Sequence, residues 1–153
     1  MRHFWRVTLL LVCLGCFGCS PPIPENIGDY VDDCILMTPE PHAPTKDDPH
    51  AGFKDVYACG ISLEELTALT NEGTPWPDGS MVLKESTKAH QGHPWLIATA
   101  TKQSGEWGWA EYTRNFATEE FAQIPVGEDT CIDCHQKVES TDFIYTRFIP
   151  ETP

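Results

Sequence analysis

The chain has 153 residues, of which 41% are hydrophobic and 22% charged, and its formal net charge at pH 7 is −13. This length suffices for one domain with a single hydrophobic core. The acidic balance argues against a nucleic-acid partner, because phosphate binding requires a basic face. An acidic surface favours solubility and is compatible with a basic redox partner.

The first nineteen residues have the features of a secretory signal. Arg2 and Arg6 form a positive start, and residues 7–14 form an apolar run that is too short to span a bilayer. Pro21 and Pro22 then prevent the run from continuing as a helix. We therefore expect an exported protein on the periplasmic side of a membrane.

The end of this segment resembles a bacterial lipoprotein signal. Cys19, between Gly18 and Ser20, is the expected lipidation site, and Cys16 is the rival. Neither cysteine has leucine three positions before it, so ordinary cleavage and a soluble periplasmic protein remain an alternative. If Cys19 is lipidated, Ser20 is the next residue, and by resemblance to bacterial lipoproteins it predicts attachment to the outer membrane.

Residues 20–52 are expected to form a proline-rich tether, a short helix and a loop, and residues 53–153 the main domain. Asn26 is placed to cap a helix with one apolar stripe. His42 and His50 fall in the loop and are expected to be exposed. The predicted stripe consists of Tyr30, Val31, Cys34 and Ile35.

The main domain begins with a strand and a capped helix. Residues 56–61 are rich in strand formers, and Ser62 with Glu65 forms a capping-box pattern. Gly73 is suited to end the helix. The leucines expected to face the core are Leu63, Leu66 and Leu69.

Antiparallel strands are predicted for most of the remaining chain. Residues 81–86 form a strand in which Val82 and Lys84 share a face by alternation. Residues 95–101 and 107–112 form a hairpin. A last strand is expected from Phe143 to Phe148, which gives an α+β fold that is mainly antiparallel β.

The run from Cys131 to His135 has the spacing C-x-x-C-H, the attachment signature of a c-type haem. Two thiols would add to the haem vinyl groups, and His135 would be the proximal iron ligand. A dithiol redox site would normally follow a buried strand, whereas Pro125 and Gly127 interrupt the chain here. A structural zinc site would need a second ligand pair, which Cys34 and Cys59 are too far apart in sequence to supply.

Cys34 and Cys59 are the two cysteines left outside the signal and the haem motif. In an oxidising compartment they can pair as a disulfide. Two buried free thiols are the alternative, because the sequence gives no distance between them.

Five segments together resemble the cytochrome P-460 and cytochrome c′-beta superfamily, over about residues 52–150. The resemblance implies an antiparallel β fold with a few helices, a homodimer, and one covalently bound haem c. It also implies a five-coordinate iron with a capped distal pocket. The segments are Val56-Tyr57, residues 77–85, residues 105–109, residues 131–135 and residues 142–150.

The resemblance gives specific roles to individual residues. Lys84 matches a lysine that is bonded to a haem meso carbon in cytochromes P-460 and is unlinked in the c′-beta members, and both outcomes remain open. Ala98 stands where hydroxylamine-oxidising members have a carboxylate, and Lys54 stands where members tend to have arginine. Ala98 and Phe53 are expected in the distal wall.

These features predict a mono-haem protein that binds nitric oxide or a related nitrogen oxide. The first alternative is an enzyme that oxidises hydroxylamine or nitric oxide, favoured if Lys84 is cross-linked and an acid other than residue 98 enters the pocket. The second is an electron-transfer cytochrome, which needs a sixth ligand such as Met37, Met81 or a histidine.

Overall fold

The computed structural model of the chain describes residues 27–46, 48–69 and 73–150. The predicted signal, lipidation at Cys19 or Cys16, and the Asn26 cap lie outside the described residues. Within the described part, no helix is both long and apolar enough to cross a membrane.

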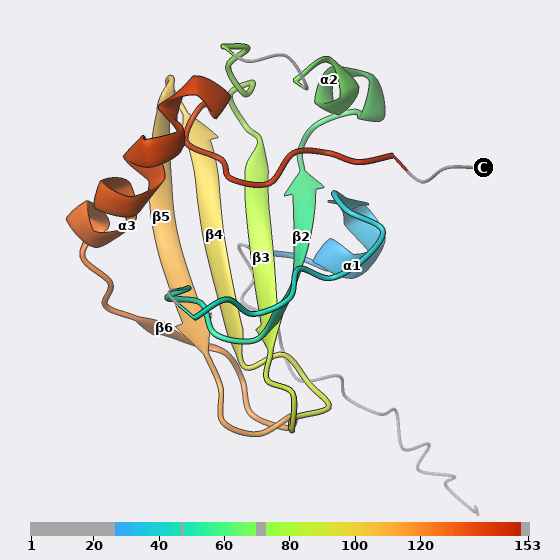
Figure 1. Cartoon of the computed structure of the whole chain (residues 1–153), viewed down its shortest axis with the longest axis vertical. Helices are drawn as coiled ribbons and strands as arrows, with labels where there is room; N and C mark the ends of the chain where they lie inside the picture. Colours follow the sequence, from blue (N-terminus) through green and yellow to red (C-terminus); the bar gives the residue numbers. More distant parts are fainter. Residues whose placement is uncertain (1–26, 47, 70–72, 151–153) are drawn as a thin grey trace, which may run out of the picture.

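A six-stranded antiparallel sheet forms the centre of the fold, with the strands in sequence order from β1 to β6 (Figure 1). This arrangement confirms the predicted α+β class. The strands are β1 (Ile35–Leu36), β2 (Phe53–Cys59), β3 (Met81–Thr87), β4 (Leu96–Gln103), β5 (Glu106–Thr113) and β6 (Ala122–Ile124). The helices are α1 (Tyr30–Asp33), α2 (Leu63–Ala68), α3 (Glu128–His135) and a 3-10 helix at Gln136–Thr141.

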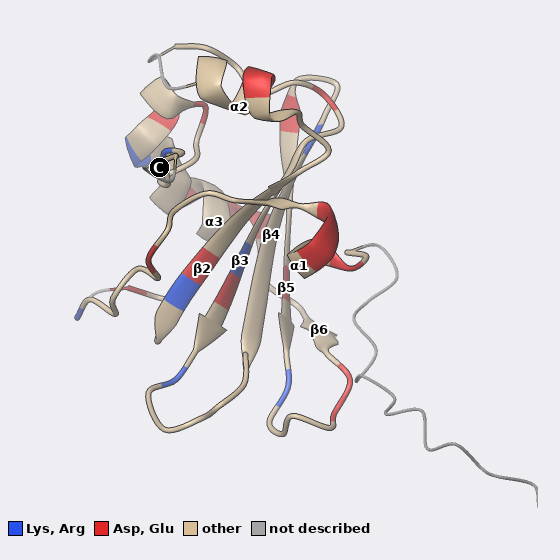
Figure 2. Cartoon of the chain, turned by 90° about the vertical axis from the view of Figure 1, so that its right-hand side faces the viewer, with Lys and Arg blue, Asp and Glu red and all other residues tan. Residues whose placement is uncertain are grey.

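The two faces of the sheet are covered by different segments. Helix α3, the loop before β2 and the C-terminal segment lie over one face, and α1 lies against the other (Figures 1 and 2). Because side chains alternate along a strand, each of the strands β2 to β5 contributes to two separate apolar clusters. One cluster includes Val56, Val82 and Ala100, and the other includes Leu83 and Ile97.

Helix α2 begins where the sequence predicts. The Ser62 side chain accepts a hydrogen bond from the Glu65 N–H, and the Glu65 carboxylate accepts one from the Ser62 N–H. Leu66 is buried, whereas Leu63 is 56% exposed, so the predicted leucine stripe faces the core only in part. The helix ends at Ala68 with Leu69 as its C-cap, so the expected termination at Gly73 is wrong, although Gly73 does have a left-handed φ of 83°.

The predicted last strand from Phe143 to Phe148 is wrong. This segment crosses over the face of the sheet instead of joining an edge, and its partly buried Phe143 and Phe148 pack on the core (Figure 1). The two edges are occupied by β1 and by β6, a short strand that the sequence analysis did not predict. The Ile149 N–H donates to the Met37 carbonyl at 2.8 Å, which fixes the crossing segment.

The short helix α1 differs from its prediction as well. It ends at Asp33, because Cys34 has an extended backbone and leads into β1. Tyr30 is buried and Val31 is 57% exposed, so they do not form one buried stripe.

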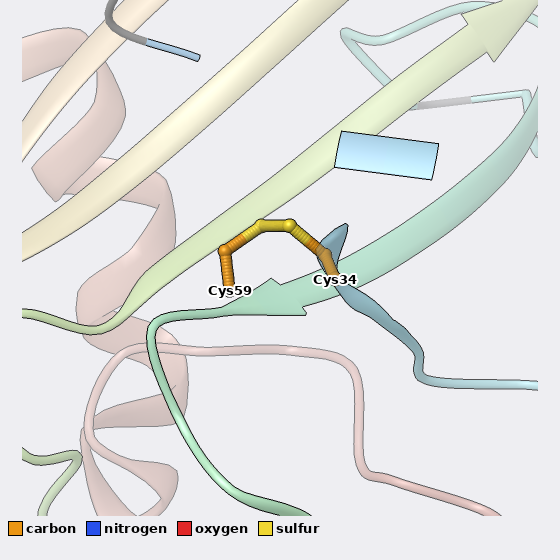
Figure 3. The surroundings of a disulfide bond; sticks show 2 residues. All are labelled: Cys34 and Cys59. Atoms are coloured by element: carbon orange, nitrogen blue, oxygen red, sulfur yellow. A yellow bond between two sulfur atoms is a disulfide. The ribbon is translucent and has the colours of Figure 1, made fainter. Parts of the chain in front are cut away.

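A disulfide between Cys34 and Cys59 ties this N-terminal segment to the end of β2 (Figure 3). Of the two alternatives that the sequence leaves open, the structure has the disulfide. It reinforces the pairing of β1 with β2, in which Ile35 lies opposite Ala58.

Candidate haem-binding site

A cavity of about 520 Å³ lies on the sheet face that α3 covers. Its volume falls within the usual range for small-molecule and cofactor sites, roughly 300–1,000 Å³. Most of the residues singled out from the sequence line it, although they come from four different elements. They are Lys54, Lys84, Ala98, Cys131, Cys134 and His135.

Helix α3 presents the C-x-x-C-H motif to this cavity. Its first turn follows Gly127, and Cys131, Cys134 and His135 fall at positions i, i+3 and i+4. Residues at these spacings share one helix face, so both thiols and the imidazole lie toward the same space. Both thiols are free, and burial raises the pKa of the Cys131 thiol above its ordinary value.

His135 is held in one orientation by its surroundings. Its Nδ1 lies 2.6 Å from the Phe143 carbonyl oxygen, so Nδ1 carries the proton and donates it. The Trp109 ring is centred 4.3 Å from the imidazole, and the Tyr145 ring 5.2 Å away at a steep angle. Burial lowers the pKa of His135, which keeps the ring neutral and leaves Nε2 with a free lone pair.

A row of four residues crosses the sheet beneath the cavity. Lys84 lies opposite Val56 on one side and opposite Ala98 on the other, and Ala98 lies opposite Glu111. Directly opposed residues in an antiparallel sheet point to the same face. The row therefore brings an amine, a methyl group and a carboxylate to adjacent positions in the cavity.

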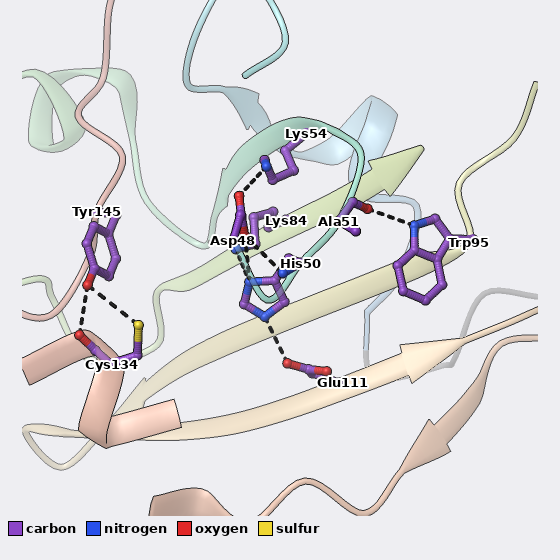
Figure 4. A network of polar contacts seen from close by, with 9 residues as sticks. All are labelled: Asp48, His50, Ala51, Lys54, Lys84, Trp95, Glu111, Cys134 and Tyr145. Atoms are coloured by element: carbon purple, nitrogen blue, oxygen red, sulfur yellow. Dashed lines mark hydrogen bonds and ion pairs between the residues drawn. The ribbon is translucent and has the colours of Figure 1, made fainter. Parts of the chain in front are cut away.

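The amine and the carboxylate are joined through a histidine (Figure 4). Lys84 Nζ lies 2.5 Å from His50 Nδ1, and His50 Nε2 lies 2.9 Å from Glu111 Oε1. Lysine can only donate here and an ionised carboxylate can only accept, so the imidazole accepts at Nδ1 and donates at Nε2. The three side chains form a continuous hydrogen-bonded chain across the cavity.

The pKa values of these groups follow from burial and from this chain. Burial lowers the pKa of Lys84 to about 8, against the opposing attraction of nearby carboxylates. The hydrogen bond from His50 holds the pKa of Glu111 below its ordinary value. Glu111 is therefore ionised at neutral pH and available to accept a proton, and a sizeable fraction of Lys84 is neutral at slightly alkaline pH.

An ion pair between Asp48 and Lys54 holds the loop that carries His50. Asp48 accepts a hydrogen bond from the Lys54 ammonium, and its other oxygen accepts the His50 N–H at 2.9 Å. Burial alone would raise the pKa of Asp48, but these two hydrogen bonds hold it below its ordinary value. The pair fixes the backbone at His50 and hence the position of the imidazole.

Three predicted residues lie elsewhere. Phe53 is 44% exposed and does not line the cavity, so its assignment to the distal wall is wrong; alternation along β2 turns Lys54 and Val56 inward and Phe53 outward. Met37 packs in the core, and Met81 packs on the opposite face of the sheet. Neither methionine is available as a sixth iron ligand from the cavity.

The sequence analysis missed His50 and Glu111 as cavity residues. His50 was expected to be an exposed loop residue, but its side chain is only 15% exposed. Ala98 stands where hydroxylamine-oxidising members have a carboxylate, but its cross-strand neighbour Glu111 brings a carboxylate to the same cavity. Alternation along residues 107–111 places Glu111 on the face of Trp107 and Trp109, a signal that was present in the sequence.

The residues present fit a covalently attached haem. Two free thiols and a neutral imidazole with its Nε2 available lie beside a cavity of suitable volume. A backbone carbonyl bound to the other imidazole nitrogen is the usual support of a metal-ligating histidine. The fold and the site together are compatible with a domain that holds a haem on one face of an antiparallel sheet.

Residues 96–146 match the family model described as Cytochrome P460. This match, which runs from β4 to the segment after the haem motif, is consistent with the resemblance inferred from the sequence. Similarity to that family suggests a haem cofactor. No curated protein matches the chain.

Proposed function

We propose that this chain is an exported c-type haem protein that binds nitric oxide or a related small nitrogen oxide. Cys131 and Cys134 hold the haem through thioethers, and His135 is the only protein ligand of the iron. The haem supplies an iron that binds small diatomic ligands and changes its oxidation state by one electron. The chain supplies the pocket, its polarity and its proton-bearing groups.

One observation carries this proposal: the C-x-x-C-H motif on α3 opens on the same cavity as Lys84, the lysine that the family resemblance singles out. Among the described candidates for a sixth ligand, Met37 and Met81 do not line this space, and His50 already uses both ring nitrogens in hydrogen bonds. His42 is the other such candidate that lines the cavity. These facts favour a five-coordinate iron over a six-coordinate electron-transfer cytochrome.

Covalent attachment is tested first by acid–acetone extraction of the purified protein. The colour should stay with the polypeptide, and it should pass to the organic layer in a Cys131→Ser, Cys134→Ser double variant. Titration of the reduced wild type with nitric oxide should then shift the absorption spectrum with saturation. Release of haem from the wild type would refute the attachment, and an unchanged spectrum would refute the ligand.

A second candidate function is the oxidation of hydroxylamine. It requires a group that removes protons from the bound nitrogen compound, and Glu111 is an ionised carboxylate in the cavity beside Ala98. Such a base typically contributes about 100- to 10,000-fold to a rate. Lys84 would also be cross-linked to the haem, as in cytochromes P-460.

Absorption spectroscopy separates these functions. A red-shifted ferrous Soret band, with a haem peptide whose mass includes the Lys84 segment, indicates the cross-linked oxidase. A high-spin spectrum without that shift indicates the nitric oxide binder. A sharp low-spin spectrum would refute both and indicate an electron-transfer protein.

The location and assembly of the protein are part of the same proposal. We infer a lipid anchor at Cys19 in the outer membrane, a homodimer, and a basic redox partner that recognises the acidic residues of the chain, which are red in Figure 2. Cys19→Ala should release the protein from the membrane fraction, whereas Cys16→Ala should not. Release only by Cys16→Ala would move the anchor to that residue, and light scattering of the soluble form tests the dimer.

A further inference from the structure

A buried ion pair connects β4 to the residue that follows the 3-10 helix. The Lys102 ammonium contacts both carboxylate oxygens of Asp142, at 2.8 and 2.9 Å. Lys102 is 5% exposed as a residue, and the Asp142 side chain is 14% exposed. One of the same oxygens accepts the Trp76 backbone N–H at 2.8 Å. We call these three residues the Asp142 clamp.

The clamp holds an unusual stretch of backbone. Asp142 and Phe143 have φ values of 50° and 67°, and neither is glycine. Two successive left-handed residues are unfavourable for amino acids with a Cβ atom, so the surrounding contacts must impose them. The Asp142 N–H donates to Glu139 at the end of the 3-10 helix, and the carboxylate is fixed from the other side by β4 through Lys102.

This backbone turn delivers a hydrogen-bond acceptor to the proximal histidine. The Phe143 carbonyl follows directly after the clamped residue and lies 2.6 Å from His135 Nδ1. The clamp residues are not hydrogen-bonded to His135. Their direct link to the imidazole is the Phe143 peptide, and Lys102 Nζ also lies 4.9 Å from the centre of the Trp107 ring. The arrangement connects a buried charge pair to the iron ligand through one backbone group.

We propose that the Asp142 clamp is a positioning device that sets the strength of the hydrogen bond to His135 and thereby tunes the haem iron. This inference rests on the proposed haem function and adds to it a group that controls the proximal side. A strong hydrogen bond at Nδ1 makes the imidazole a better electron donor. A better donor stabilises the ferric iron and lowers the reduction potential.

The direct test is Asp142→Asn in the haem-loaded protein. Asparagine tolerates the left-handed conformation and can still accept the Trp76 N–H, but it cannot form the ion pair with Lys102. We expect a more positive reduction potential and a lower iron–histidine stretching frequency in the resonance Raman spectrum of the ferrous protein. A purely structural role would change the melting temperature without moving these two signals.

Asp78→Asn is the matched control, because the Asp78 carboxylate also fixes a backbone N–H, that of Gly105 at 2.8 Å, but takes no part in the Lys102–Asp142 ion pair. Lys102 provides a second pair of variants. Lys102→Arg retains the ion pair and should keep the wild-type potential, whereas Lys102→Met should shift it in the same direction as Asp142→Asn. These variants decide the question even if Asp142→Asn does not accumulate as holoprotein.

Unchanged potential and Raman frequency in Asp142→Asn or Lys102→Met would overturn the clamp. The same would follow if Asp78→Asn or Lys102→Arg shifted them as much. The outcomes also separate this inference from the proposed function. Variants that shift the potential of a haem that does not bind nitric oxide would support the clamp and overturn only the proposed ligand, whereas a wild type without covalent haem would overturn both.

Discussion

The same strands form a cavity on one face of the sheet and a packed apolar cluster on the other. On β3, Lys84 points into the cavity and its neighbour Glu85 points to the face covered by α1. Glu85 accepts a 2.5 Å hydrogen bond from the Tyr30 hydroxyl and belongs to a closed, well-packed layer. Lys84 instead joins a chain of polar groups beside an open space of about 520 Å³.

Burial acts on both groups but leaves them in different states. It raises the pKa of Glu85 and lowers the pKa of Lys84, to about 8. On the packed face the Glu85 carboxyl accepts a hydrogen bond from Tyr30, and this contact stabilises the fold. On the cavity face the polar groups are linked to one another and can exchange protons with a bound molecule. Substitutions on the two faces should therefore affect different properties.

The largest expected effect is on hydroxylamine oxidation. If that activity is present, Glu111→Gln should reduce its turnover by about 100- to 10,000-fold, because glutamine keeps a hydrogen-bonding group beside His50 but cannot accept a proton. Glu85→Gln is the matched control on the packed face and should leave turnover unchanged. Steady-state kinetics with an artificial electron acceptor measure both, and equal losses would show that the effect is not specific to the cavity.

The next largest effect concerns stability. Leu83 is fully buried on the packed face, so Leu83→Ala should lower the free energy of unfolding by about 2–5 kcal/mol. Val82→Ala, one residue away on the cavity face, removes fewer atoms beside an existing cavity and should cost less. Denaturant titration of the two variants gives the comparison. A larger loss for Val82→Ala would mean that the cavity face carries more of the packing than the structure indicates.

The disulfide should contribute to stability without affecting the site. Cys34 and Cys59 are 25 residues apart in sequence, and closure of a loop of that size is worth about 3 kcal/mol. Replacing both by Ser should lower stability by about this amount and leave the nitric oxide-bound spectrum unchanged. Val31→Ala, at an exposed position in the same segment, should change neither the stability nor the spectrum. A change of spectrum in the double variant would show that the α1 segment supports the cavity.

The sequence predicted the parts of this fold that depend on local patterns. Alternation along β3 placed Val82 and Lys84 on one face, and the capping pattern placed the start of α2 at Ser62. The motif at Cys131–His135 identified the side chains that the structure presents to the cavity. In each case the signal lies within a few residues, and tertiary contacts reinforce it.

The remaining features depend on contacts that no short pattern encodes. His50 resembles an ordinary loop histidine until the Asp48–Lys54 ion pair fixes its backbone. The segment from Phe143 to Phe148 has a strand-like composition, but both sheet edges are already occupied. Alternation alone places Glu111 on the face of Trp107 and Trp109, but only the strand register, which the whole sheet sets, brings it opposite Ala98.

The smallest predicted effect is a pH dependence that isolates Lys84. Its pKa in the folded chain is about 8, against an ordinary value of 10.5, so the unfolded chain holds this proton over a range where the folded chain has lost it. Stability due to this group therefore rises with pH from about 8 toward 10.5. Between about pH 7 and about pH 9 the gain should be roughly 1 kcal/mol relative to Lys84→Met.

This last comparison requires unfolding measurements on wild type, Lys84→Met and the exposed control Lys46→Met at both pH values. The difference between wild type and Lys84→Met should grow in favour of wild type as pH rises, while Lys46→Met should follow wild type. A difference that does not change with pH would mean that Lys84 is not a buried free amine. Mass spectrometry of the same samples then distinguishes the reasons, because a lysine already bonded to the haem has lost the ammonium that this titration follows.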